Sequence, residues 1–444
     1  MENCSSVRPP HFIVWLIKNK FREPETALRT GRPIHLQRPY FPARVQGRIV
    51  PNLIPYMATE RRDKTSFVRS GEHGAAPQFS KPAMSPIAPD LRTDVLTGQQ
   101  VIVAESRSLR PVRLAQSAAA PPAGDDPFME GRESLTPGET LALRAVDSQP
   151  NEPGWLLRVV PNQFPAAESS EPEPAQQCET PEVFLMQPVR GVHEVVLECP
   201  DYRAQLTGLA VTEVARVLHA WQLRVRALSA LPWISSISVF RNEGIGAGAS
   251  LPHCHSQILA TDFIGDRIAQ LIDRSQKSRE ETGQCIVEQW LSSEISADRR
   301  VLRLSRDFAT VCPFASRVPW QCRIVPLTVS RFDLLSAEQI CSLAAELHSA
   351  ASAVQAVADN VAHNVILTLP PPPATPAAFL WHLDLLPRPS RMAGFEFGTN
   401  VDILAVAPET AVARMQEHVS PDPEQGGADA LCPDGFTWVA AAAD

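Results

Sequence analysis

A short stretch near the middle of the chain holds the residues best suited to chemistry. Three spaced glycines in Gly244-Ile245-Gly246-Ala247-Gly248 lead into an alternating segment, His253-Cys254-His255-Ser256-Gln257. Because successive side chains of a strand point to opposite faces, we expect His253, His255 and Gln257 to share one face. Glycines also let backbone N–H groups approach a phosphate, to which Ser250 could add a hydroxyl donor. The stretch therefore predicts chemistry on phosphorus.

Each half of this pattern is ambiguous by itself. A His-x-His pair is also typical of metal ligands or of two ordinary polar residues on a strand, and spaced glycines are a weak signal. In combination they favour phosphoryl chemistry, because a neutral imidazole is a competent nucleophile toward activated phosphorus. A hydrogen bond from its second ring nitrogen to a carbonyl would set the tautomer, and one such histidine is sufficient.

Periodicity predicts the elements that position this stretch. Apolar residues recur at helical spacing between Leu206 and Leu228 and predict a long amphipathic helix, with Trp221 in its core-facing stripe. Other segments predict strands of a mostly antiparallel sheet beneath this helix. These strand predictions are Gln100–Ala104, Val183–Gln187, Glu194–Glu198 and Ile234–Phe240.

The second half of the chain repeats this order in degenerate form. Segments 311–314 and 321–325 predict strands, and Ser336-Ala337-Glu338-Gln339 is a capping box that begins a helix ending near Val357. Three further strand predictions come after this helix. The second half therefore echoes the order of elements in the first.

Composition excludes several classes of protein. The chain has 41 basic and 49 acidic residues and a formal charge of −8, so nothing indicates a surface for nucleic acid. Nine scattered cysteines, an odd number, are typical of reduced thiols in a cytosol. The apolar run 12–17 is too short to span a bilayer or to form a signal-peptide core, so we expect neither membrane insertion nor secretion.

Residues 1–85 differ from the rest of the chain, because they are basic, rich in proline and without sustained periodicity. A segment that offers so little periodic apolar surface is expected to be disordered or loosely attached. Met84 stands directly before the patterned region, and we expect the true start of the protein to lie nearer to it.

Four further motifs accompany the histidine segment in a fixed order. They are Leu96-Thr97-Gly98-Gln99, Arg107-Ser108-Leu109-Arg110-Pro111, Val160-Pro161-Asn162-Gln163-Phe164-Pro165 and Gly191-Val192-His193-Glu194-Val195. Together these segments resemble the galactose-1-phosphate uridylyltransferase family, the transferase branch of the histidine-triad superfamily. In that branch glutamine replaces the third histidine, as Gln257 does here. The resemblance covers roughly residues 86 to 418 and extends to the ADP-glucose phosphorylase-like members of the family.

The resemblance implies an α+β fold of two tandem histidine-triad-like half-domains, each a mostly antiparallel sheet covered by helices. These half-domains would span residues 86–295 and 296–420 and leave a tail at 421–444. His382 and Asp384 would lie on the strand equivalent to the catalytic one. A cytoplasmic homodimer is also implied.

The same resemblance implies a two-step nucleotidyl transfer. His255 would attack the α-phosphorus of a nucleotide sugar and release a sugar 1-phosphate, and an acceptor phosphate would then discharge the nucleotidyl-histidine. Gln257 would hold a non-bridging phosphate oxygen. The residues that match nucleotide- or phosphate-contacting positions are Arg107, Arg110, Asn162, Asn242, Gly248 and Ser250.

The sugar-phosphate side departs from enzymes that use galactose 1-phosphate. Ser390 and Phe395 stand where those enzymes carry lysine and tyrosine, and Phe395 is followed by Glu396. This pattern resembles the ADP-glucose phosphorylase branch, in which inorganic phosphate is the acceptor. We expect a hexose-1-phosphate nucleotidylyltransferase like the UDP-glucose-dependent enzymes, with adenylyl transfer to phosphate as the alternative. A nucleotide-binding protein without turnover is a further alternative, against which the retained His255 and Gln257 argue.

Members of the family commonly hold a structural zinc ion, whose ligands are mostly replaced here. The matching positions are Asp126, Met129, Tyr202 and His253. A thioether and a neutral phenol are poor zinc ligands, so at most two good ligands remain of the four that such a site requires. We therefore expect no bound metal, and we expect His253 to be a hydrogen-bonded core residue that supports the strand.

Overall fold

The computed structural model describes residues 89–441, apart from 110–125, 171–186, 373–378 and 421–426. The leader predicted at 1–85 lies outside the described residues, as do Arg110 and residues 183–186 of one predicted strand. All described residues fall within the compact unit that contains Pro86–Asp444.

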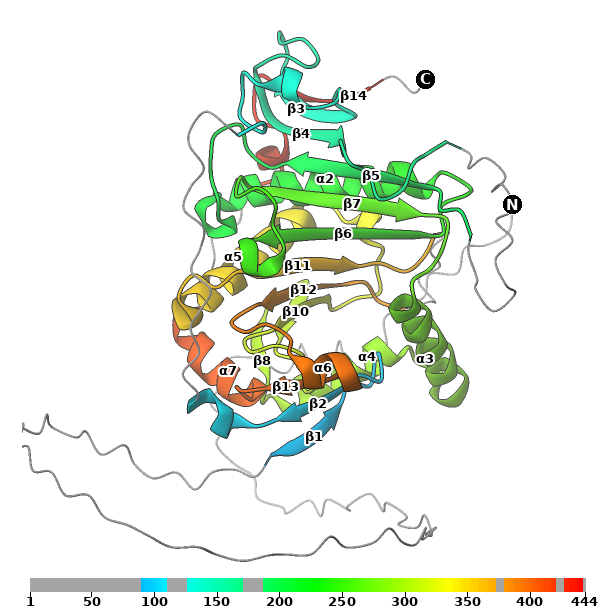
Figure 1. Ribbon diagram of the computed structural model, residues 1–444, viewed down its shortest axis with the longest axis vertical. Coiled ribbons are helices and arrows are strands. Elements are labelled where there is room, and N and C mark those ends of the chain that lie inside the picture. Colours follow the sequence, from blue (N-terminus) through cyan, green and yellow to red (C-terminus); the bar gives the residue numbers. More distant parts are fainter. Residues whose placement is uncertain (1–88, 110–125, 171–186, 373–378, 421–426, 442–444) are drawn as a thin grey trace, which may run out of the picture. The chain divides into compact units, whose positions relative to one another are not determined.

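Eleven strands among the described residues form one large sheet (Figure 1). Their bounds are β3 (Leu141–Ala145), β4 (Trp155–Pro161), β5 (Gly191–Leu197), β6 (Ser236–Glu243), β7 (His255–Thr261), β8 (Val301–Leu304), β9 (Phe308–Val311), β10 (Cys322–Pro326), β11 (His363–Thr368), β12 (His382–Pro387) and β14 (Phe436–Ala440). The spatial order is β14-β3-β4-β5-β7-β6-β11-β12-β10-β9-β8. Every neighbouring pair is antiparallel, so β7 lies inside the sheet with β5 and β6 on its two sides.

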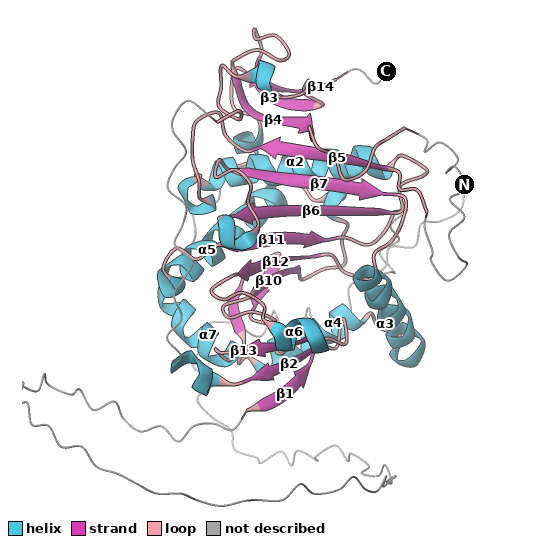
Figure 2. Ribbon diagram, in the orientation of Figure 1, coloured by secondary structure: helices cyan, strands magenta, loops and turns pink. Residues whose placement is uncertain are grey.

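A second, three-stranded sheet consists of β1 (Asp90–Thr93), β2 (Gln100–Val103) and β13 (Val401–Leu404). The α-helices, drawn in cyan in Figure 2, are α2 (Val211–Ser229), α3 (Asp266–Thr282), α4 (Ile286–Ala297), α5 (Ala337–Ala358), α6 (Gly394–Thr399) and α7 (Pro408–Met415). Short 3₁₀ helices are η1 (Glu105–Leu109), η2 (Glu133–Leu135), η3 (Leu206–Gly208), η4 (Ile245–Ala247), η5 (Phe332–Leu334), η6 (Gln416–His418) and η7 (Ala428–Leu431). Within the described ranges no helix is long and apolar enough to cross a membrane.

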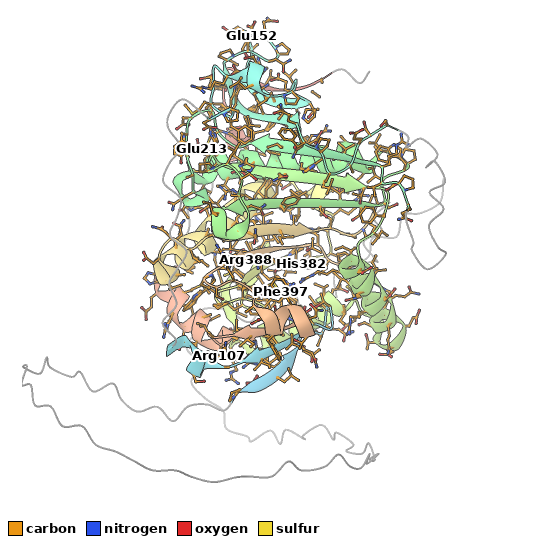
Figure 3. All side chains as sticks on the ribbon, viewed as in Figure 1. Arg107, Glu152, Glu213, His382, Arg388 and Phe397 are labelled. Carbon is orange, nitrogen blue, oxygen red and sulfur yellow. The ribbon has the colours of Figure 1, made fainter. Side chains whose placement is uncertain are left out.

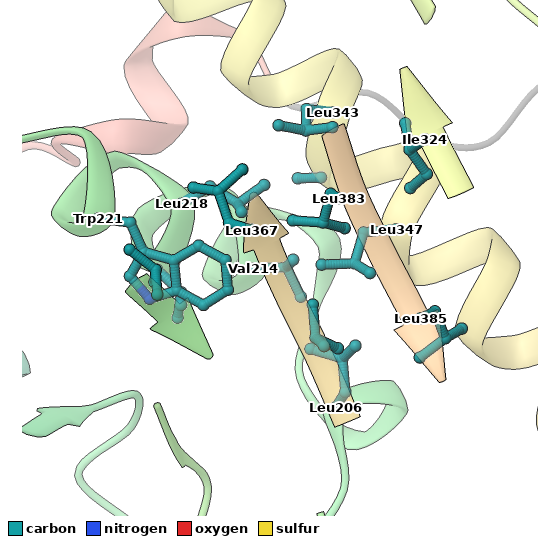
Figure 4. Packing of buried hydrophobic residues seen from close by; sticks show 14 of the residues in the cluster. Leu206, Val214, Leu218, Trp221, Ile324, Leu343, Leu347, Leu367, Leu383 and Leu385 are labelled. Atoms are coloured by element: carbon teal, nitrogen blue, oxygen red, sulfur yellow. The ribbon is translucent and has the colours of Figure 1, made fainter. Parts of the chain in front are cut away.

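Helices α2 and α5 cover one face of the large sheet, and their apolar stripes form the main core with it (Figure 4). Trp221 of α2 is 1% exposed, and its indole N–H donates a hydrogen bond of 2.8 Å to Ser256 Oγ on β7. Ile258, two residues further along β7, is buried in the same core. Because side chains alternate along a strand, His255 and Gln257 point to the opposite face of the sheet.

The predicted helices and most predicted strands are confirmed. Helix α2 carries the apolar stripe with Trp221, and α5 begins at the predicted capping box. There Ser336 Oγ accepts from the backbone N–H of Gln339, whose side-chain oxygen accepts from the N–H of Ser336. Strands β2, β5, β6 and β10 overlap the strands predicted at 100–104, 194–198, 234–240 and 321–325. The fold is therefore a mixed one of antiparallel sheet and helices, as the sequence predicts.

Three predicted boundaries are wrong. The helix predicted from Leu206 begins only at Val211, because the chain at Leu209 is extended after the short helix η3. The strand predicted at 311–314 lies earlier and ends at Val311, because Pro313 has no N–H for a ladder bond. The strand with the alternating histidines begins at His255, so His253 precedes it. The reason is local, since the N–H of Cys254 donates to the carbonyl of Arg203 in a loop rather than to a neighbouring strand.

Segments from the C-terminal part of the chain complete both sheets. Strand β14 belongs to the segment that the sequence sets apart as a tail, and it pairs antiparallel with β3 at the edge of the large sheet. Strand β13 pairs in parallel with β2. Both sheets therefore join segments from opposite ends of the described chain.

The hydrogen bond between Trp221 and Ser256 yields a prediction about stability. We expect Ser256→Ala to lower the free energy of unfolding by about 1–3 kcal/mol, because the buried indole N–H loses its acceptor. Chemical denaturation measures this, with Ser238→Ala as control, an exposed serine on the neighbouring strand β6. Equal stability of the two variants would show that the bond contributes nothing.

Candidate active site

His255 is the first residue of β7 and is held from one ring nitrogen. Its Nδ1 donates a hydrogen bond of 2.7 Å to the carbonyl oxygen of His253. In a neutral ring this bond places the proton on Nδ1 and leaves a lone pair on Nε2. Among the described residues no hydrogen bond engages Nε2. The geometry therefore leaves the lone pair of Nε2 available to an incoming group.

The surroundings of His255 keep its ring neutral. The residue is 7% exposed, and the ring of Phe128 stands edge-on to it with the centroids 5.3 Å apart. Burial lowers the pKa of His255 below its usual value and outweighs the hydrogen bond to His253, which acts in the other direction. The unprotonated, nucleophilic form is thus the dominant one at neutral pH.

Two amide side chains flank His255 on the same face of the sheet. Gln257 lies two residues further along β7 and pairs with Phe240 of β6. Arg241 pairs with Ser256, so Asn242 is the residue beside His255 where the two strands end. Alternation puts Phe240, Asn242, His255 and Gln257 on one face. The structure therefore brings together three of the predicted site residues.

A third amide joins this group through His193 of β5. The ring of His193 lies between Gln257 and Asn162, with its Nε2 2.9 Å from Gln257 Oε1 and 3.3 Å from Asn162 Nδ2. Its Nδ1 accepts a hydrogen bond of 3.1 Å from the backbone N–H of Ala166. Asn162, predicted from the sequence, is thus placed beside Gln257.

The glycine turn between β6 and β7 folds on itself. Gly244 and Gly248 have φ angles of +80° and +88°, which residues with a Cβ atom rarely adopt. The N–H of Gly248 donates to the carbonyl of Ile245, and the N–H of Ala249 to that of Gly244. The expectation that the glycine amides are free is therefore wrong for Gly248. Ser250, which is exposed at the end of the turn, keeps its hydroxyl available.

A buried cluster of charges lies on the helix-covered face directly behind this site. Arg241 is 2% exposed and donates to Glu198 at 3.0 Å and to Glu243 at 2.5 Å. Glu243 also accepts the backbone N–H of Leu206 at 2.7 Å. Burial raises the pKa of Glu243, but the nearby His363 and Arg241 outweigh it and leave that pKa below its usual value. The cluster joins β6 to the end of β5 and to β11.

Other predicted site residues lie elsewhere. Figure 3 places Arg107, on η1, beside the small sheet and away from β7. Phe395 and Glu396 lie on α6, where Glu396 accepts the N–H of Ala393 at 3.0 Å. Asp384 is buried in an ion pair with Arg323, which lowers its pKa to about 2 against the opposing effect of burial. Burial lowers the pKa of His382 on the same strand to about 4.

At the positions that would hold a structural zinc ion, His253 forms hydrogen bonds with other groups of the protein. His253 is 1% exposed, its Nδ1 lies 2.6 Å from Asp126 Oδ2, and its Nε2 lies 3.0 Å from the carbonyl oxygen of Cys199. Tyr202 contributes only the edge of its ring, with its centroid 6.2 Å from that of His253. Burial raises the pKa of Asp126, but the hydrogen bond with His253 helps to bring it below its usual value.

These residues do not fit a zinc ion. Both ring nitrogens of His253 are engaged by oxygen atoms of the protein, at Asp126 and at the carbonyl of Cys199, so neither is free to bind a metal. The nearby Cys199 remains a thiol, because a hydrogen bond with Cys254 and burial raise its pKa far above the usual value. Across the described residues no group of three or more His, Cys, Asp or Glu side chains could hold a metal ion.

Several residues of the site carried no functional prediction from the sequence. His193 lies in one of the sequence motifs, but the sequence assigns it no role. Strand alternation predicts only that its side chain points to the same face of the sheet as that of Val195. Asn364 donates to Asn242 Oδ1 from a strand 122 residues away in the chain. Such long-range partners have no signature in spacing.

Known proteins of one family are similar to this chain. The family model described as galactose-1-phosphate uridyl transferase, N-terminal domain, matches residues 79–265. The ADP-glucose phosphorylase of Arabidopsis thaliana is 29% identical over 337 residues, which are 74% of this chain and 93% of that protein. A galactose-1-phosphate uridylyltransferase of Thermotoga maritima is 29% identical over 237 residues, which are 53% of this chain and 66% of that protein.

Solved structures of proteins with related names are similar to this chain in fold. The crystal structure of an ADP-glucose phosphorylase from Arabidopsis thaliana with bound ADP-glucose superposes with a TM-score of 0.61 at 28% identity. It covers 75% of this chain and 100% of that one. A structure of a uridylyltransferase, at 23% identity and a TM-score of 0.58, shares the fold.

The hydrogen bonds of His253 yield a prediction about metal content. We expect protein purified without chelator to contain far less than one zinc ion per chain, because His253 and Cys199 offer no ligand atoms in the required form. Elemental analysis measures this, and the melting temperature should not change with EDTA. Near-stoichiometric zinc whose removal lowers the melting temperature would contradict the prediction.

Proposed function

Because the chain belongs to the galactose-1-phosphate uridylyltransferase family of nucleotidyltransferases, we propose that it transfers a nucleotidyl group through a covalent bond to His255. The donor is a nucleotide sugar, and the acceptor is a phosphate oxygen. The observation that carries this proposal is the single hydrogen bond from Nδ1 of His255 to the carbonyl of His253, which leaves Nε2 available for attack.

The first step forms a bond from Nε2 to the α-phosphorus and breaks the bond from that phosphorus to the sugar 1-phosphate, which leaves with the electron pair. In the second step an acceptor phosphate oxygen attacks the same phosphorus. The phosphorus–nitrogen bond breaks, and Nε2 recovers its lone pair. The low pKa of His255 supports both steps, because an imidazolium has no lone pair for attack.

Negative charge on the phosphoryl oxygens requires preorganised donors, and the amides of Gln257, Asn242 and Asn162 are placed for this role. Donors of this kind act in a site partly shielded from water, where removing one typically lowers kcat by about 100- to 1000-fold. An amide at position 257 cannot serve as a general base for water. This supports transfer to a bound phosphate acceptor rather than hydrolysis.

We propose ADP-glucose as donor and inorganic phosphate as acceptor ahead of the uridylyl reaction. The Arabidopsis ADP-glucose phosphorylase aligns over 93% of its length, whereas the Thermotoga uridylyltransferase aligns over 66% of its own. Ser390 in place of a lysine also removes a charge from the sugar-phosphate side. UDP-glucose with galactose 1-phosphate remains the second candidate, and an assay of both substrate pairs tests the choice.

The strand order supports two half-domains of common plan. In the first half β3, β4 and β5 adjoin in sequence, α2 comes next, and β7 lies between β5 and β6. In the second half β8, β9 and β10 adjoin, α5 comes next, and β12 lies between β10 and β11. The two sets meet at the pairing of β6 with β11. Strand β12 is thus the counterpart of β7, and its His382 has a structural role beside the Arg323–Asp384 ion pair.

We further propose a homodimer whose sites combine residues of both copies. Phe397 of α6 is 74% exposed and Phe395 is 44% exposed, so α6 presents apolar surface for an interface. Arg107 and Glu396 match substrate-contacting positions of the family. A second copy could bring them to His255, since one chain holds Arg107 beside the small sheet.

The covalent step yields a direct prediction. We expect His255→Asn to lower kcat by at least about 1000-fold and to leave nucleotide binding nearly unchanged, because the variant lacks the nucleophile but keeps a donor for the His253 carbonyl. Labelled ADP-glucose should leave an acid-labile, base-stable label on the wild type alone. His348→Asn on α5 is the control and should keep both activity and label. Unchanged turnover by His255→Asn would refute the mechanism.

Mixing two inactive variants tests the shared site. We expect equimolar His255→Asn and Glu396→Ala chains, unfolded and refolded together, to recover about one quarter of wild-type activity, since half of the dimers are mixed and each holds one intact site of two. Light scattering checks that dimers form, and each variant refolded alone is the control. Dimers without recovered activity would place Glu396 in the same chain's site or outside the site.

A further inference from the structure

The side-chain amides around His255 share one orientation that their own contacts determine. We propose that His193 and Asn364 are positioning residues that bind the amide oxygens of Gln257 and Asn242 and so turn both NH₂ groups toward the phosphoryl group. This inference rests on the proposed attack by His255. It concerns two residues that touch the amides and not the substrate.

The orientation of Gln257 depends on a backbone donor. The N–H of Ala166 can only donate, and it lies 3.1 Å from His193 Nδ1. That nitrogen must therefore be the acceptor, and the proton of the neutral ring must be on Nε2. Nε2–H in turn requires an acceptor at 2.9 Å, which is the oxygen of Gln257. The NH₂ group of Gln257 consequently points away from His193.

The orientation of Asn242 depends in the same way on obligate partners of Asn364. Arg388 Nε can only donate, and it lies 2.6 Å from Asn364 Oδ1. The carbonyl of Ala247 can only accept, and it lies 2.8 Å from Asn364 Nδ2. These two bonds fix the amide of Asn364, whose NH₂ group also donates to Asn242 Oδ1 at 2.8 Å. The NH₂ group of Asn242 is left for another partner.

The amide oxygen of Asn162 is also engaged, but by a backbone N–H group rather than by another side chain. Its Oδ1 accepts the backbone N–H of Phe164 at 2.8 Å, and its NH₂ group lies 3.3 Å from His193 Nε2, which carries a proton and therefore cannot accept from it. Three amides near His255 thus have their oxygens engaged by the protein. An amide is both donor and acceptor, and without such partners either end could face the substrate. A flipped amide would set its oxygen against a phosphoryl oxygen, where both carry negative charge.

Holding the donors costs the enzyme nothing at the moment of reaction, because their orientation is settled when the protein folds. The side chain of His193 is half-buried, whereas that of Asn364 is buried between β6, β12 and the glycine turn. Asn364 therefore couples the position of the turn, through Ala247, to the orientation of Asn242. The expected effect of losing either residue is on kcat rather than on KM for the nucleotide sugar.

Two variants of His193 test the role. We expect His193→Phe, which keeps a ring but no hydrogen bond, to lower kcat by about 10- to 100-fold, less than outright loss of a donor. His193→Gln retains a donor and an acceptor and should recover most of that loss. His219→Phe on α2 is the matched control, because it also loses a contact to a glutamine, His219 Nδ1 to Gln222 Oε1 at 3.0 Å, far from the chemistry. It should leave kcat unchanged.

A double-mutant cycle separates positioning from general stabilisation. If His193 acts through Gln257, His193→Phe should have almost no further effect on kcat in a Gln257→Ala background. Asn364→Asp, which replaces the donor by an acceptor, should likewise lose its effect in an Asn242→Ala background. Effects that multiply in the double variants would overturn the proposal, as would a His193→Phe enzyme with wild-type kcat.

A spectroscopic measurement keeps the inference independent of activity. In protein labelled with ¹⁵N-histidine, the His193 signals, assigned by their loss in His193→Phe, should show a protonated Nε2 and an unprotonated Nδ1. A protonated Nδ1 would overturn the proposal. Absence of a label on His255 in the wild type would defeat the proposed function instead, while the tautomer would still test the orientation of Gln257.

Discussion

The backbone hydrogen bonds that hold β7 between β5 and β6 are the interaction on which the rest of the structure depends. They fix the alternation of its side chains, so that Ser256 and Ile258 enter the core under α2 while His255 and Gln257 face the other way. A shift of the register by one residue would exchange these faces and bury both polar groups in the apolar core. Stability and chemistry therefore place the same demand on this strand.

Formal charge is distributed unevenly around the site. Arg241 lies on the helix-covered face of the sheet, where Glu198 and Glu243 accept hydrogen bonds from its guanidinium group. On the face with His255 the adjacent side chains are neutral amides, those of Gln257 and Asn242. In the proposed reaction these amides would meet the charge of the phosphate without counter-ions of their own. Arg388 is already near this group through Asn364, and in the proposed dimer a second copy of the chain would add a further cation, Arg107.

The sequence contains enough to predict the elements and much of the site, and the reason is that these depend on local patterns. The helical period around Trp221 and the capping box at Ser336 both predict helices that exist. The place of Gln257 beside His255 depends only on alternation. The contacts of Asn364 and His193 depend on strand register between distant segments, which no local pattern encodes. The self-closure of the glycine turn at Gly248 was missed because it depends on backbone torsion rather than on residue type.

The pairing of β14 with β3 has a consequence for how the chain reaches this structure. A ribosome releases β3 long before β14, so the edge of the large sheet stays without its last strand while the intervening residues are synthesised. Contacts between segments so distant in sequence are slow to form, because a long loop must close before they become favourable. The exposed backbone of β3 could meanwhile pair with a neighbouring nascent chain. The large sheet can be completed only after β14 has been synthesised, and molecular chaperones that shield unpaired strands would act most usefully before that point.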